Sequence, residues 1–127
     1  MDKECKVSIL TRAKAGGSLV TKSDGSYYLK HGKSYVIFEA EGDKCRLEFD
    51  ENCLVYKRQG ELNYTMCLMP GEKTGTDMIS SAGRSHIECL TKSYSMKIKK
   101  DVINIILGYN IADEEIGMEI TITGEFL

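Results

Sequence analysis

The sequence predicts an all-β chain that folds as a single antiparallel up-and-down barrel of about eight to ten strands. Three observations lead to this prediction. Turn residues recur at nearly regular intervals, the segments between them alternate apolar and polar side chains, and no long segment has a clear helical period. Turns spaced about 8–12 residues apart are typical of all-β sandwiches and barrels. Strict alternation indicates a strand with one buried face.

Short turn segments divide the chain into the predicted strands. They are rich in glycine, aspartate and asparagine, which favour turns, and one contains the single proline. These segments are Ser23-Asp24-Gly25, His31-Gly32, Glu41-Gly42-Asp43, Asp50-Glu51-Asn52, Gln59-Gly60, Pro70-Gly71, Ala82-Gly83, 99–101 and 112–115, and Gly16-Gly17-Ser18 forms a loop after the first strand. We expect His31 to be a turn residue with positive φ, a conformation that histidine tolerates.

The segments between the turns carry the alternation. Apolar residues at every second position are expected to face the interior, as in Val7 and Ile9, in Cys45, Leu47 and Phe49, and in the series Ile116, Met118, Ile120 and Ile122. Neighbouring strands joined by such short turns must pair antiparallel. A sheet of eight or more strands tends to curl and close, which removes exposed edges.

The segment from Asp101 to Ile111 fits two structures. Its apolar residues match one face of a helix as well as one face of a strand. Many of them are β-branched, and Gly108 interrupts the run, so we favour a strand.

Length and composition favour one globular domain over residues 1–127. Hydrophobic residues make up 42% and charged residues 28% of the 127 positions, and the formal net charge is −2. Such a balance argues against nucleic acid as a partner. No apolar run is long enough for a signal peptide or a membrane helix, so we expect a cytoplasmic protein with no membrane partner.

Five cysteines are present, but no two form a C-x-x-C pair, which zinc sites often use. We therefore predict no metal and no cofactor, and interpret most of these cysteines as buried thiols. A structural disulfide or a reactive thiol remains the alternative. The cysteines are Cys5, Cys45, Cys53, Cys67 and Cys89.

Several short motifs together resemble the YwiB-like family of small bacterial proteins of unknown function. The motifs are Tyr27-Tyr28-Leu29-Lys30, Gly32-Lys33, Tyr35, Gly83, Thr91-Lys92-Ser93 and Glu119-Ile120-Thr121-Ile122. The resemblance implies a calycin-like, lipocalin-type barrel. It implies no activity, because the family has no established catalytic residues.

A barrel of this kind is able to hold a small ligand in its lumen. We predict a small-molecule-binding protein whose ligand is small and partly apolar. The candidate lumen residues are Tyr28, Tyr35, Phe49, Tyr56 and Tyr109. The alternative interpretation is that these aromatic side chains only pack the core.

Two other functions stay open. A protein-interaction module or homodimer with a filled core is one. The other is an enzyme that uses Arg84, His86 and Glu88, which lie on one face of a strand. We do not expect an enzyme. The opposite face of this strand is more apolar and is expected to face the core, so the three residues would lie on the outside. Four lysines, Lys92, Lys97, Lys99 and Lys100, suggest an anion-binding patch, but a role in solubility is the favoured interpretation.

Overall fold

The computed structural model describes residues 3–124, which form ten strands and no helix. Alternating apolar residues build each strand, and short turns with glycine or asparagine separate most of them. The strands are β1 Lys3–Ala13, β2 Ser18–Lys30, β3 Lys33–Ala40, β4 Asp43–Phe49, β5 Leu54–Gln59, β6 Leu62–Leu68, β7 Lys73–Ser80, β8 Gly83–Lys99, β9 Val102–Ile111 and β10 Glu114–Gly124.

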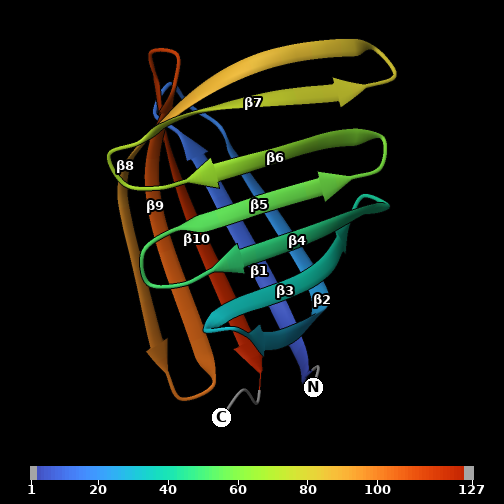
Figure 1. Cartoon of the computed structure of the whole chain (residues 1–127), viewed down its shortest axis with the longest axis vertical. Helices are drawn as coiled ribbons and strands as arrows, with labels where there is room; N and C mark the ends of the chain where they lie inside the picture. The colour runs from blue at the N-terminus through green and yellow to red at the C-terminus, as the bar shows by residue number, and fades with distance from the viewer. Residues whose placement is uncertain (1–2, 125–127) are drawn as a thin grey trace.

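The ten strands close into a barrel. Each strand pairs antiparallel with its neighbours in sequence, and β1 pairs with β10 to complete the wall. This arrangement confirms the predicted all-β, up-and-down barrel. The ambiguous segment is a strand, since Val102–Ile111 forms β9 between β8 and β10. Figure 1 shows β4 to β7 crossing β1, β9 and β10 at a large angle.

Two long strands turn the corners between these two halves of the wall. Strand β2 pairs with β1 as far as Tyr27 and with β3 from Gly25 onward. Strand β8 pairs first with β7 and then with β9, with a register shift between Thr91 and Ser93. The predicted turn at Ser23-Asp24-Gly25 is therefore wrong. The glycine there lies inside β2, at the corner that this strand makes.

The hairpin turns use residues with positive φ. His31 has a φ of 53°, which confirms its predicted place in a turn. Glu41, Lys100 and Ala112 adopt similar values at three other turns.

The interior is packed with apolar side chains from nearly every strand. Leu47, Phe49, Ile105 and Ile120 are almost completely shielded from solvent. Each such residue stabilises the fold by about 1.5–3 kcal/mol through burial. The middle of the barrel thus holds one apolar cluster.

One end of this core holds an ion pair between the buried Asp43 and the half-buried Arg58. The Arg58 Nε donates to Asp43 Oδ2 at 2.8 Å, and the backbone amides of Glu61 and Leu62 also donate to the same carboxylate, at 2.9 and 3.3 Å. Asp43 begins β4, while its donors lie around the β5–β6 turn. The carboxylate therefore joins two hairpins, and these hydrogen bonds lower its pKa.

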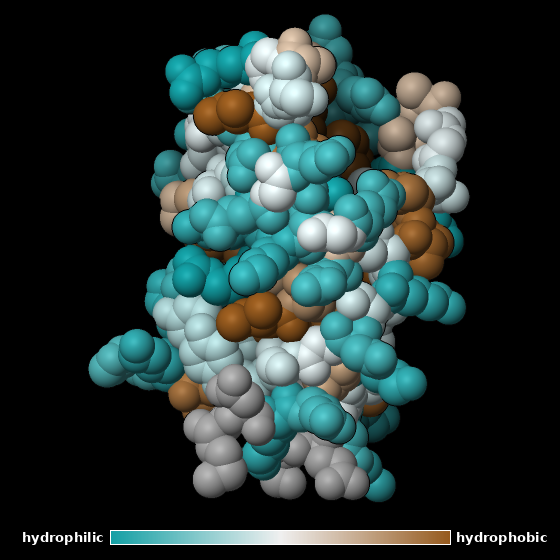
Figure 2. Space-filling model, turned by 90° about the vertical axis from the view of Figure 1, so that its right-hand side faces the viewer, coloured by the Kyte–Doolittle hydropathy of each residue, from teal (hydrophilic) through white to brown (hydrophobic). Residues whose placement is uncertain are grey.

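Hydrophobic side chains also reach the surface. In Figure 2 they form separate spots among hydrophilic ones on the face that is shown. Among residues 3–124 no helix has the length and hydropathy needed to cross a membrane.

Candidate functional site

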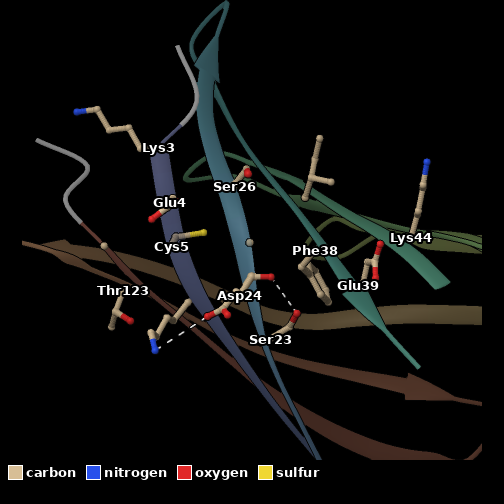
Figure 3. A pocket seen from close by; sticks show the side chains of 14 residues that line it. Lys3, Glu4, Cys5, Ser23, Asp24, Ser26, Phe38, Glu39, Lys44 and Thr123 are labelled. Atoms are coloured by element: carbon tan, nitrogen blue, oxygen red, sulfur yellow. Dashed lines mark hydrogen bonds and ion pairs between the residues drawn. The ribbon is translucent and has the colours of Figure 1, made fainter. Parts of the chain in front are cut away.

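A hollow lies where β2 and β3 separate. The two strands are paired from Gly25–Phe38 to Lys30–Lys33 and part beyond that point. Between Asp24 and Glu39 they leave a cleft of about 1600 Å³, which we call the β2–β3 cleft. Figure 3 shows it from close by, with Lys44 on the neighbouring strand.

The cleft reaches both faces of the barrel wall. Consecutive residues of one strand point to opposite faces. Both Ile37, on the outer face, and Phe38, on the inner face, line the cleft, as do Ser23 and Asp24 of β2. The hollow therefore passes along the gap between two strands and borders the barrel interior.

Gly25 lines the cleft, and the space around it leaves no room for a larger side chain. A Cβ at this position would lie 2.8 Å from the carbonyl oxygen of Ile37 and 3.3 Å from Val7. The bare backbone lets β2 approach β3 closely at the corner.

Aromatic side chains continue from the cleft into the barrel. The Phe38 ring meets the Tyr56 ring edge-on, with centroids 6.2 Å apart, and Tyr56 lies 5.8 Å from Tyr64. Burial raises the pKa of both tyrosines, so their hydroxyls stay protonated. The cleft thus leads to an apolar interior with neutral hydroxyl groups.

The rim of the cleft carries charges of both signs. Lys6 Nζ lies 4.0 Å from Asp24 Oδ1, and both side chains are exposed, so this pair adds little stability. Below the rim, burial and the nearby Asp24 raise the pKa of Cys5 to about 11. Cys5 is therefore a neutral thiol at pH 7, and it contributes apolar surface rather than a nucleophile.

The structure separates the five aromatic residues that the sequence suggested for a lumen. Phe49, Tyr56 and Tyr109 are buried inside the barrel. Tyr28 and Tyr35 lie on the outer wall, where their rings stack with centroids 4.8 Å apart. The five residues therefore do not surround one space.

A polar atom without a partner lies near Tyr109. Thr91 is its register partner on β8 and is fully buried. Among the buried side-chain nitrogen and oxygen atoms of residues 3–124, only the Thr91 Oγ1 has no hydrogen bond. An unpaired buried hydroxyl marks a position that suits a water molecule or the polar group of a ligand.

Arg84, His86 and Glu88 are exposed on the outer wall, as the alternation predicts. Two of them pair with residues of the neighbouring strand β7. His86 Nδ1 lies 2.7 Å from Asp77 Oδ1, and Glu88 Oε2 lies 3.0 Å from Lys73 Nζ. The His86 hydrogen bond lowers the pKa of Asp77. These are cross-strand pairs on a surface, and they do not support the enzymatic alternative.

No set of three or more metal-binding side chains is found within the described residues. All five cysteines are free thiols, and three of them, Cys5, Cys45 and Cys89, are buried. The other two, Cys53 and Cys67, are half-buried.

Sequence reasoning did not identify Phe38 or Ser23 as site residues. The available signal was Gly25, a glycine within a stretch that otherwise continues the strand pattern. We interpreted it as a turn residue, and so the corner and its cleft were not predicted.

The architecture defines a class, the small closed antiparallel β-barrels with ten strands. The model of the family described as "Domain of unknown function (DUF1934)" matches residues 7–121, and the chain belongs to this family. It is also similar to the crystal structure of the ywiB protein from Bacillus subtilis, with a TM-score of 0.87 and 20% sequence identity. That match covers 97% of this chain and 92% of the other, and it confirms the predicted family resemblance. No curated protein matches this chain.

Proposed function

We propose that this protein binds a small, partly apolar molecule in the β2–β3 cleft. The main support is the hollow itself, which borders the interior and has room for a drug-sized ligand, for which about 300–1000 Å³ is typical. Ile37, which is 42% exposed, and Phe38 offer apolar contact. Ser23 and Ser26 offer hydroxyl groups to the ligand's polar end.

A cytoplasmic location is part of the proposal. Five free thiols in a chain of 127 residues are typical of a reducing compartment.

The test uses prodan, a neutral amphipathic dye whose emission shifts to the blue when it leaves water. We expect saturable binding by the full chain. Ser23→Arg places a long charged side chain in the cleft and is expected to weaken binding about tenfold or more, which corresponds to about 1.4 kcal/mol. Ser95→Arg is the matched control, because Ser95 is exposed on β8 and does not line the cleft.

Equal affinity of both variants and the wild type would contradict the proposal. So would a blue shift that never saturates.

Self-association is a second candidate function. It is favoured by the stacked Tyr28 and Tyr35 on the outer wall, with the partly exposed Ile37 on the same face of β3. Sedimentation velocity tests it, since a monomer at about 10 μM would place the Kd of any dimer above that concentration and exclude a stable homodimer.

A further inference from the structure

A second hollow lies at the opposite end of β1 from the β2–β3 cleft. It has a volume of about 670 Å³ and lies over β1, β10, β9 and β8. Gly117 of β10 and Gly108 of β9 are register partners, and both line it. Two adjacent strands therefore present no side chain at its centre.

Neither glycine has a positive φ. A Cβ on Gly117 would meet nothing within 4 Å, and a Cβ on Gly108 would meet only the side-chain oxygen of Ser93. Packing therefore does not require glycine at position 117. Glycine inside a strand marks a bulge, a tight bend, or a place where a ligand or another backbone approaches closely. The β8 bulge lies beside Gly108, whereas the register runs without a shift through Gly117.

Cationic side chains surround this glycine pair. Arg12 is the register partner of Gly117 on one side, and Lys92 lies at the β8 bulge on the other. Neither has an ion pair or hydrogen bond from its side chain to any residue in the range 3–124. Lys14 also lines the hollow, where it pairs with Glu115 at 3.2 Å.

The positive charge is local, because the chain as a whole has a net charge of −2. Three cations and one carboxylate line the hollow. Glu114, the next carboxylate along β10, is exposed and does not line the hollow, and Glu119 accepts a hydrogen bond from Asn104 Nδ2 at 3.1 Å.

The spacing of the cations indicates the kind of ligand. Strands β10 and β9 separate Arg12 from Lys92, so their Cα atoms are about 14 Å apart at the usual strand spacing. A single small anion would have to be shared by both cations, whereas a molecule with two anionic groups offers each cation its own partner. Arginine holds phosphoryl oxygens with paired hydrogen bonds, and lysine acts as a point charge.

We propose that this glycine-floored hollow binds a small molecule that carries a diphosphate group. Arg12 and Lys92 bind its two phosphoryl groups, and the bare strands below let the ligand lie close to the wall. This site is independent of the ligand that we propose for the β2–β3 cleft.

Isothermal titration of the full chain with inorganic pyrophosphate tests the proposal. The ionic strength is kept near 0.01 M, where the screening length is about 30 Å. We expect pyrophosphate to bind more tightly than phosphate. The double variant Arg12→Gln/Lys92→Gln is expected to lower the affinity about tenfold or more.

Two further variants separate a built site from general charge attraction. Gly117→Thr fills the floor without changing the charge and is expected to weaken binding about tenfold, with a Tm no lower than that of the wild type. Lys57→Gln removes a positive charge on β5 and is expected to leave the affinity unchanged. Equal losses for Lys57→Gln and the double variant, or undiminished binding by Gly117→Thr, would overturn the proposal. Absence of pyrophosphate binding by the wild type would also overturn it. Because prodan is neutral, its binding in the cleft does not depend on this result.

Discussion

Within residues 3–124, Asp43 is the one charged residue that is buried. Its carboxylate accepts hydrogen bonds from Arg58 and from two backbone amides of the β5–β6 turn, and these lower its pKa. A group whose folded pKa lies below its unfolded value stabilises the fold above the unfolded value. That stabilisation is lost as the pH falls through the folded pKa.

Asp43→Asn should therefore lower stability at neutral pH and matter less in acid. We expect the difference in unfolding free energy between wild type and variant to narrow as the pH falls below about 3.9, the usual unfolded value. Urea unfolding at a series of pH values measures it. The exposed Asp113→Asn serves as control. If the difference in unfolding free energy between wild type and Asp43→Asn stays constant down to pH 2, the charge of the Asp43 carboxylate does not stabilise the contact between the two hairpins.

Two glycines in strands should respond oppositely to alanine. At Gly25 the new Cβ would press on the backbone oxygen of Ile37, so we expect a loss of about 1–3 kcal/mol. At Gly117 the Cβ meets nothing, and alanine should be neutral or stabilise by up to about 1 kcal/mol. Chemical denaturation of both variants measures the contrast, and equal effects would refute the close approach at the β2 corner.

Strands β6 and β7 are joined in an unusual way. Their register pairs are Leu62–Ser80 and Asn63–Ile79, near one end of the two strands. Farther along, Thr76 Oγ1 donates to the Thr65 carbonyl oxygen at 3.0 Å, and Thr74 Oγ1 donates to that of Cys67 at 2.7 Å. Side-chain hydroxyls thus replace backbone donors along this seam.

Thr76→Val removes one of these hydroxyls at nearly constant volume. We expect a loss of about 1–3 kcal/mol, because the Thr65 carbonyl loses its donor. The substitution should accelerate amide hydrogen exchange more in β6 and β7 than in β9 and β10. Thr65→Val is the control, since the Thr65 side chain is exposed and its carbonyl is kept. If exchange accelerates equally in all strands, the seam is not a local weak point.

At the scale of the whole molecule, alternation and turn spacing predicted the barrel well. The series Ile116, Met118, Ile120 and Ile122 faces the core, because side chains two positions apart on a strand lie on the same face. The face of Tyr28 and Tyr35 was harder to assign, since either face of a half-buried strand accepts an aromatic ring. A glycine such as Gly25 is expected both in a turn and at a corner inside a strand. The cleft could therefore be recognised only from the pairing of β2 with β1 and β3.

The central claim is that a closed barrel with a packed core binds its ligand at the gap between β2 and β3. Titration of the ¹⁵N-labelled protein with prodan, followed by amide chemical shifts, tests this claim most directly. We predict that the largest shifts occur at Gly25, Ser26 and Phe38, with small changes in β9. Shifts centred on Tyr109 and Thr91 instead, or spread evenly over the outer wall, would contradict it.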